Sequence, residues 1–235
     1  MTGLDAPLDD CLPEVPPGTG ITLRHLAEHT SGLPRLPPGD TGTTADPYIG
    51  FTEDSLSELL SGLDRLATGQ PGVSEYSNLG YAILGRALTE ASGRTYQQLV
   101  DEHVLAPLGL AAGDITANPP HDRRLVASTL LGRPRPTWTL TGPILSAGGL
   151  WSTPRILAAA VVGLLVERRL GPPAPTWQRA QSVLWHNGAT HGASAIAVAH
   201  DDGRWLVLHR LSSNARRTDR MAIKALRSSG PITGS

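Results

Sequence analysis

The segment Tyr76-Ser77-Asn78 carries the most specific chemistry in the sequence. It follows a Pro-Gly turn and precedes a helical pattern, so the Tyr76 phenol can project into a cleft, while Asn78 offers both a donor and an acceptor. Tyrosine can act as a general base only where nearby positive charge lowers its pKa from about 10. The simpler alternative is a buried tyrosine before a helix that is capped by asparagine.

A second polar segment, His186-Asn187-Gly188, falls on a predicted strand. Small residues follow from Ala189 onwards, and they let a ligand approach the strand backbone. A backbone N–H near Ala189 can then donate to an oxyanion, with His186 as a further neutral or cationic donor. The alternative is an ordinary strand whose polar side chains face solvent.

Two other arrangements of chemically active residues receive less support. His25 and His29 fit His-x-x-Glu-His, a zinc-binding pattern, but no downstream helix supplies a clear carboxylate ligand. We therefore expect no metal and no other cofactor. The sequence has eight histidines, but it has no Gly-x-Ser-x-Gly turn to position the serine of a Ser-His-Asp triad.

Helices are expected in the first two thirds of the chain, and they position Tyr76 and Asn78. The predicted helices are 21–29 with Thr22 as N-cap, 53–66, 79–91 ending on Gly93, 95–107, and one from Thr153-Pro154 to Arg168. In the helix 79–91 the residues predicted to be buried are Leu79, Ile83, Leu84, Ala87 and Leu88. The loop 35–52 is rich in Pro, Gly and Thr and looks too polar and broken to pack regularly, and 111–148 is a long stretch that Pro and Gly interrupt.

The last third changes to a strand pattern. Strands are predicted at 182–188, 193–199 and 204–211, with Asp202-Gly203 as a hairpin turn, and a final helix at 215–227. Helices followed by an antiparallel sheet indicate an α+β fold. We expect one domain over 1–235, mostly helical over 21–170, with the sheet and the last helix over 182–228.

Composition excludes several classes of function. The net charge is -1 over 235 residues, which gives no electrostatic footprint for nucleic acid or for an anionic membrane. Cys11 is the single cysteine, the N-terminus lacks a signal-peptide pattern, and the apolar run 156–166 is too short to span a bilayer. We therefore expect a cytoplasmic protein that binds neither nucleic acid nor membrane.

Five segments in order resemble the β-lactamase-related serine hydrolases, which include class C β-lactamases, penicillin-binding proteins, D-Ala-D-Ala carboxypeptidases and esterases. They are HLAEHTSGLP at 25–34, PGVSEYSNLGYAILGRALTEASGRTY at 71–96, APLGL at 106–110, SAGGLWSTP at 146–154 and HNGATHGASA at 186–195. The resemblance covers roughly residues 4–226 and implies a β-lactamase/transpeptidase-like fold. It implies that the ligand is a small acyl, ester or peptide-like molecule.

The same resemblance implies a role for each site residue. Tyr76 corresponds to the general base, Asn78 to a contact with the substrate amide, and His186 to the third catalytic motif. The residues expected to line the substrate site beside them are Ser77, Asn187, Gly188 and Ala189, and the Ala189 N–H corresponds to half of the oxyanion hole.

The first family motif, Ser-x-x-Lys, which carries the nucleophile, does not occur. Lys224 is the only lysine and Met221 stands three residues before it. Relatives carry this motif before the HTSGLP-like segment, so the resemblance implies a chain that begins after the nucleophile helix and the first strands. A smaller mismatch is Ile156, where relatives usually carry an acidic residue.

Three readings follow for function. In the first, the chain is a family hydrolase whose recorded start is wrong or whose N-terminus was cut. In the second, it is a nucleophile-free homologue that binds an acyl or peptide-like ligand, or that performs acid–base chemistry with Tyr76 and His186. The third reading is a structural protein that another chain completes. The missing strands would leave the strand 204–211 on an open sheet edge, where Trp205 and Val207 could pair with a partner or a second copy.

Overall fold

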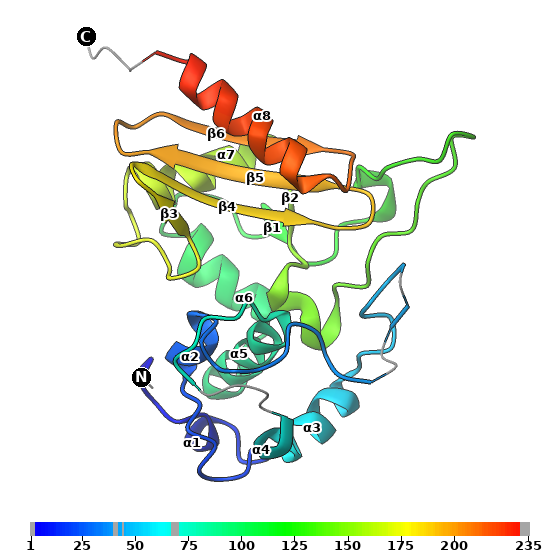
Figure 1. Ribbon diagram of the computed structural model, residues 1–235, viewed down its shortest axis with the longest axis vertical. Coiled ribbons are helices and arrows are strands. Elements are labelled where there is room, and N and C mark those ends of the chain that lie inside the picture. The colour runs from blue at the N-terminus through cyan, green and yellow to red at the C-terminus, as the bar shows by residue number, and fades with distance from the viewer. Residues whose placement is uncertain (1–2, 40–41, 44, 67–70, 231–235) are drawn as a thin grey trace. The chain divides into compact units, whose positions relative to one another are not determined.

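The computed structural model describes residues 3–39, 42–43, 45–66 and 71–230. These residues form two compact units, 1–99 with 138–150, and 100–137 with 151–235. Each unit is described by itself, and the expectation of a single domain stays a prediction. The elements of the chain (Figure 1) are α1 (Leu8–Cys11), α2 (Leu23–Ala27), α3 (Glu53–Ser61), α4 (Leu63–Leu66), α5 (Asn78–Ser92), α6 (Tyr96–Val100), η1 (Asp101–Leu105), β1 (Ile115–Thr116), η2 (His121–Arg123), η3 (Gly142–Ala147), β2 (Trp151–Ser152), α7 (Pro154–Val161), η4 (Val162–Val166), β3 (Gln178–Ala180), β4 (Val183–Ala189), β5 (Ser194–His200), β6 (Trp205–Arg210) and α8 (Ala215–Ser228).

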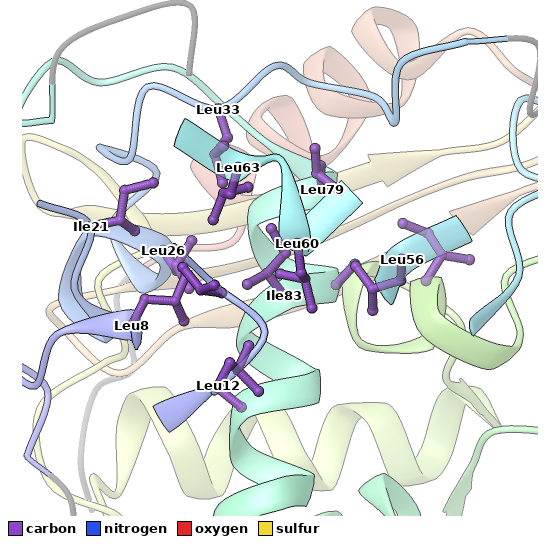
Figure 2. Packing of buried hydrophobic residues seen from close by; sticks show 14 of the residues in the cluster. Leu8, Leu12, Ile21, Leu26, Leu33, Leu56, Leu60, Leu63, Leu79 and Ile83 are labelled. Carbon is purple, nitrogen blue, oxygen red and sulfur yellow. The ribbon is translucent and has the colours of Figure 1, made fainter. Parts of the chain in front are cut away.

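The first unit is built around α5, because this helix carries a long apolar face. Its buried face includes Leu79 and Ile83. Leucine and isoleucine side chains from α1 to α4 and from the segments between them pack with this face (Figure 2), and they include Leu8, Leu12, Ile21, Leu26, Leu33, Leu56, Leu60 and Leu63. Glycine fixes how closely η3 approaches α5. A Cβ on Gly85 would lie 2.3 Å from Ser146 Oγ, and the Ser146 hydroxyl donates to the Tyr81 carbonyl at 2.7 Å.

Most predicted helices of this unit are confirmed, because their caps are local signals. Thr22 and His25 form a capping box at α2, and Gly93 ends α5 in the left-handed conformation at φ 64°. Gly62 divides the predicted helix 53–66 into α3 and α4.

One prediction about packing in this unit is wrong, and another, the irregular loop 35–52, is confirmed but incomplete. Leu88 is 43% exposed instead of buried, since it lies on the outer side of α5. The stretch 35–52 packs through two aromatic side chains, as Tyr48 and Phe51 are 1% and 6% exposed. Aromatic rings bury enough apolar area to anchor a loop that is otherwise rich in proline and glycine.

The second unit is a four-stranded antiparallel sheet between helices. The strand order is β3-β4-β5-β6, and the predicted strands 182–188, 193–199 and 204–211 are confirmed as β4, β5 and β6. Side chains alternate between the two faces. One face packs against α7 and η4 through Leu184, Ala197 and Ala199, and the other packs against α8 through Ile196 and Val198 (Figure 1).

The α+β prediction is therefore confirmed, with additions that the sequence pattern did not give. The stretch 111–148 contains β1, which pairs with β2, as well as η2 and η3. The strand β3 was not predicted, since all three of its residues are exposed and it has no apolar alternation. Among the described residues no strand pairs with the outer side of β6, as expected for the edge 204–211.

No helix among the described residues has both the length and the apolar character needed to cross a membrane.

Candidate functional site

Ser77 fixes the start of α5 between the two predicted site residues. Its side chain is fully buried, its hydroxyl accepts from the Gly80 N–H at 2.8 Å, and it donates to the Pro34 carbonyl at 2.7 Å. Both functions of the hydroxyl are therefore used inside the protein. We assign Ser77 to the positioning of Tyr76 and Asn78, whereas the sequence predicted that it contacts the substrate.

His29 supports this turn from a strained backbone conformation. Its φ of 56° is uncommon for a residue other than glycine. The Nδ1 atom accepts from the Ser77 N–H at 3.1 Å, and the imidazole ring lies 4.3 Å from the Tyr76 ring and 4.8 Å from the Tyr81 ring. Because α2 ends at Ala27, His29 does not share a helix face with His25.

The two histidines therefore lack the arrangement on one helix face that the pattern His-x-x-Glu-His requires. His25 Nδ1 accepts from the Thr22 N–H at 3.2 Å within the capping box. The part of the chain that the structure describes holds no group of three or more His, Cys, Asp or Glu side chains suited to a metal ion.

Tyr76 presents its phenol at the surface of the first unit, with 41% of the residue exposed. Partial burial raises the pKa of the phenol above its ordinary value, and the nearby Arg35 guanidinium lowers it by less. Within its own unit Tyr76 is therefore a neutral hydrogen-bond donor at pH 7. The general-base role that the resemblance implies needs more positive charge than Arg35 supplies.

Asn78 is half-buried at the first residue of α5, and its amide is oriented by a residue that sequence reasoning missed. Asn78 Nδ2 donates to the hydroxyl of Tyr48 at 2.6 Å, and the Tyr48 ring is held edge-on by Trp138 at 5.8 Å. With Nδ2 engaged, Oδ1 is the atom of Asn78 that can accept from a ligand N–H. Tyr48 lies 30 residues from Asn78, so no local pattern links the two.

The second motif lies on β4, as predicted, and its side chains alternate between the faces of the sheet. His186 is half-buried on the α7 face, where its ring lies 5.8 Å from that of Trp177. Burial lowers the pKa of His186, so the imidazole is neutral at pH 7. Asn187 points to the α8 face and donates to Asp219 Oδ2 at 2.8 Å. We therefore assign Asn187 to anchoring β4, in place of the predicted substrate contact.

Gly188 and Ala189 are exposed at the end of β4, and the strand register gives the direction of the Ala189 N–H. The Thr190 N–H donates to the Ala193 carbonyl at 2.8 Å, which continues the pairing of β4 with β5. Hydrogen-bonded and non-hydrogen-bonded pairs alternate along an antiparallel ladder, so the pair Ala189–Ser194 is non-hydrogen-bonded. The Ala189 N–H therefore points away from β5, on the side of β4 where β3 pairs only with 183–185. In this direction the N–H is not used in pairing with β5 and can donate to an oxyanion.

The structure thus places Tyr76 and Asn78 together in the first unit, and His186, Gly188 and Ala189 together in the second. The family model for beta-lactamase matches residues 2–234.

The chain belongs to the beta-lactamase family.

Relatives within this family include peptidases and beta-lactamase-like proteins. The chain is 36% identical over 137 residues to the D-alanyl-D-alanine-carboxypeptidase/endopeptidase AmpH of Escherichia coli (strain K12), which covers 58% of the chain and 34% of AmpH. It is 35% identical over 133 residues to Beta-lactamase-like protein 2 of Dictyostelium discoideum, which covers 57% of the chain and 23% of that protein. The matched part of the chain thus spans about a third or less of the length of these curated relatives.

Solved structures confirm the beta-lactamase/transpeptidase-like fold. A class C beta lactamase from Rhodobacter sphaeroides has a TM-score of 0.75 at 17% identity, covering 96% of the chain and 78% of that structure. A Beta-lactamase/D-alanine Carboxypeptidase from Yersinia pestis has a TM-score of 0.70 at 23% identity, and the match covers 95% of the chain and 76% of that structure.

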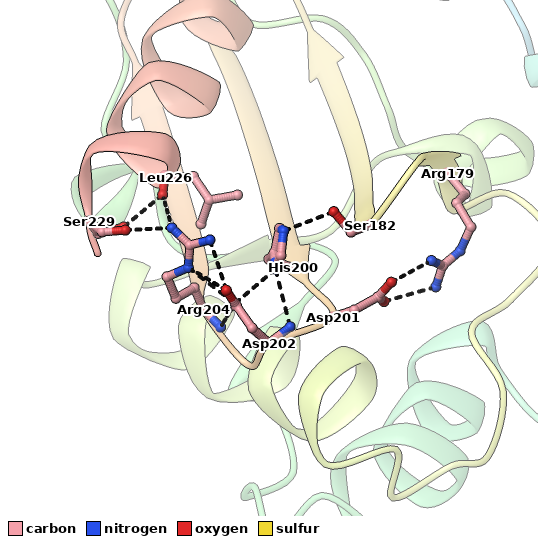
Figure 3. A network of polar contacts seen from close by, with 8 residues as sticks. All are labelled: Arg179, Ser182, His200, Asp201, Asp202, Arg204, Leu226 and Ser229. Atoms are coloured by element: carbon pink, nitrogen blue, oxygen red, sulfur yellow. Dashed lines mark hydrogen bonds and ion pairs between the residues drawn. The ribbon is translucent and has the colours of Figure 1, made fainter. Parts of the chain in front are cut away.

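This beta-lactamase-family chain also contains a serine, a histidine and an aspartate in contact through the histidine, Ser182, His200 and Asp202 (Figure 3). Ser182 Oγ lies 2.8 Å from His200 Nε2, and His200 Nδ1 lies 2.9 Å from Asp202 Oδ1, which are triad-like distances. The Asp202 backbone N–H, however, donates to Nδ1 at 3.1 Å. This bond places the ring proton on Nε2, whereas the Asp202 carboxylate favours it on Nδ1, so these contacts do not establish His200 as a base for Ser182.

The charged groups near this serine are paired within the protein. The Asp202 carboxylate is held by Arg204, whose guanidinium also donates to carbonyls at the end of α8 (Figure 3). Arg179 pairs with Asp201 on the other side of the turn. These bonds join β3, the β5–β6 turn and α8, and we assign the whole network to holding the sheet end together.

Proposed function

We propose that this chain supplies the ligand-recognition residues of a beta-lactamase-family serine hydrolase scaffold. The ligand is an acyl, ester or peptide-like molecule with an amide or ester group. The observation that carries the proposal is the pair formed by the exposed phenol of Tyr76 and the amide of Asn78, which buried Ser77 and Tyr48 hold in place.

Each site residue then has a specific role. The carbonyl Oδ1 of Asn78 accepts a hydrogen bond from the ligand's amide N–H. The neutral phenol of Tyr76 donates a hydrogen bond to the ligand. The Ala189 N–H and His186 bind the acyl oxygen, because the N–H is directed away from β5 and the imidazole is a neutral donor.

Hydrolysis through an acyl-enzyme is not part of this proposal. The 235 residues contain no Ser-x-x-Lys, and removal of the nucleophile from a catalytic triad lowers turnover by about 10⁶. Binding of the ligand does not need the nucleophile, so recognition can be tested directly on this chain.

The test is calorimetric titration with N-acetyl-D-alanyl-D-alanine, a probe chosen for the peptide chemistry in the name of AmpH. We expect saturable binding that Asn78→Ala weakens about tenfold, the worth of one or two hydrogen bonds in a partly buried site. Asn118→Ala, at an exposed asparagine in the second unit, is the control and should bind as the wild type does. Equal binding by both variants would contradict the role of Asn78.

A second candidate function, acid–base chemistry, is favoured by the opposite pKa shifts at the two motifs. The pKa of Tyr76 is raised and that of His186 is lowered, so the phenol keeps its proton while the imidazole can accept one at pH 7. The assay is exchange of the ligand's α-hydrogen with deuterated water, followed by proton NMR. Tyr76→Phe should abolish exchange while the ligand still binds, and exchange at the wild-type rate would rule the mechanism out.

A further inference from the structure

Arg35 places a guanidinium group next to the Tyr76 phenol. Its terminal carbon lies 5.4 Å from the centre of the Tyr76 ring, which is within the range of a cation–π contact. The Arg35 residue is exposed, as Tyr76 is, so both groups are accessible on the same surface of the first unit.

The backbone of Arg35 is tied to the helix that carries Asn78. The Arg35 carbonyl accepts from the Asn78 N–H at 3.0 Å and from the Leu79 N–H at 3.4 Å. The preceding carbonyl, that of Pro34, accepts from the Ser77 hydroxyl at 2.7 Å. Arg35 is therefore built into the turn of the site, although it is exposed.

Arg35 differs in its ionic contacts from several other arginines that the structure describes. The arginines with a carboxylate partner include Arg24, Arg86, Arg169, Arg179 and Arg204. No carboxylate of the described residues lies within ion-pair distance of Arg35. Asp46, an acidic residue of the same loop, instead accepts from the Thr139 N–H at 2.8 Å and from the Thr139 hydroxyl at 2.6 Å.

A guanidinium group with this placement is suited to an anionic ligand group. It offers five N–H donors in a planar fork that matches the two oxygens of a carboxylate. The acceptor Oδ1 of Asn78 belongs to the same turn, so the first unit presents an acceptor for an amide N–H and donors for a carboxylate.

We propose that Arg35 is a specificity-determining residue that binds a carboxylate of the ligand beside Tyr76. This inference rests on the proposed function and adds a substrate class to it, namely N-acyl compounds that carry a negative charge. Arg35 touches the ligand's anionic group and leaves the amide to Asn78.

The experiment compares three ligands that share one amide. N-butyryl-D-alaninamide is neutral. N-butyryl-D-alanine carries a carboxylate on its alanine part, which supplies the amide nitrogen, and N-succinyl-D-alaninamide carries one on its acyl group. We expect one of the two acids to bind about tenfold more tightly than the neutral amide, the ratio for one exposed charge-assisted contact. The acid that does so shows at which end of the ligand Arg35 lies.

Three variants identify the source of this preference. Arg35→Gln should reduce the tenfold ratio to about one and leave the affinity for the neutral amide unchanged, while Arg35→Lys should retain part of the ratio. Arg135→Gln changes an exposed arginine of the second unit and should behave as the wild type does. Thermal unfolding of each variant checks that the fold is intact.

Two failures can be told apart. If the wild type binds all three ligands equally, or if Arg35→Gln keeps the tenfold ratio, the inference about Arg35 is wrong and the proposed function stands. If the wild type binds none of the three, the proposed function fails and the inference fails with it. A titration of Tyr76 by ultraviolet absorbance adds a readout. If Arg35→Gln raises the pKa of the Tyr76 phenol but leaves the ratio of the two affinities unchanged, Arg35 only adjusts the pKa of Tyr76 and does not bind the carboxylate.

Discussion

Replacement of Ser77 by alanine tests whether this residue positions the site or contacts the ligand. Ser77→Ala removes the acceptor for the Gly80 N–H at the start of α5 and the donor to the Pro34 carbonyl. Loss of an N-cap hydroxyl costs about 1 kcal/mol, and a carbonyl left without its donor costs about 1–2 kcal/mol. We therefore expect the free energy of unfolding to fall by about 2–3 kcal/mol.

The assay is thermal unfolding followed by circular dichroism. In a chain of this size each kcal/mol lowers the Tm by about 2–4 °C, so the variant should unfold about 4–12 °C below the wild type. If the two units unfold separately, only the transition of the unit that contains α5 should move. Ser228→Ala removes an exposed hydroxyl that bonds the Lys224 carbonyl in α8, and this control should leave the Tm unchanged.

The opposite result would refute the assignment of Ser77. A Ser77→Ala variant as stable as the wild type, but with lost ligand binding, would show that the hydroxyl serves the ligand. Our assignment predicts instead that any loss of binding accompanies a loss of stability.

Three further predictions concern packing, reactivity and association. Gly85→Ala should destabilise the fold by about 1–3 kcal/mol in urea unfolding, because its Cβ would lie 2.3 Å from Ser146 Oγ. Gly80→Ala in the same helix meets nothing nearer than 3.4 Å and should be neutral or slightly stabilising; equal effects would contradict the packing of η3 on α5. A fluorophosphonate or β-lactam probe should form no covalent adduct by mass spectrometry, and a stoichiometric adduct on Ser182 would refute the structural role that we assign to the Ser182–His200–Asp202 contacts. The β6 edge should make the chain self-associate in analytical ultracentrifugation, and Val207→Pro should shift it towards monomer; a wild-type monomer at all concentrations would count against this.

Local signals in the sequence predicted most of the secondary structure. Thr22 and Thr153 cap α2 and α7 as expected, and Gly93 ends α5, because each signal acts within three or four residues of the chain. The hairpin turn at Asp202-Gly203 likewise joins the strands predicted on either side of it. The exposed strand β3 has no such signal and was missed.

The arrangement around Tyr76 could be predicted only in part, because it depends on contacts between distant segments. Tyr76 and Asn78 were identified from their motif, whereas His29 contacts Ser77 across 48 residues and Tyr48 contacts Asn78 across 30. Which side chains of a motif face inward also depends on these contacts. Ser77 looked like a ligand residue in the sequence and is buried as a helix cap in the structure.

The central claim is that Asn78 and the end of β4 recognise an acyl ligand without a nucleophile. Nitrogen–proton NMR spectra recorded during titration with N-butyryl-D-alaninamide test it most directly, since this ligand is neutral and does not depend on Arg35. Our account predicts saturable shifts, with one dissociation constant, for the Ala189 N–H and the Asn78 side-chain amide, and none for the Asn118 amide. Unchanged spectra, or shifts that spread evenly over the surface, would contradict it.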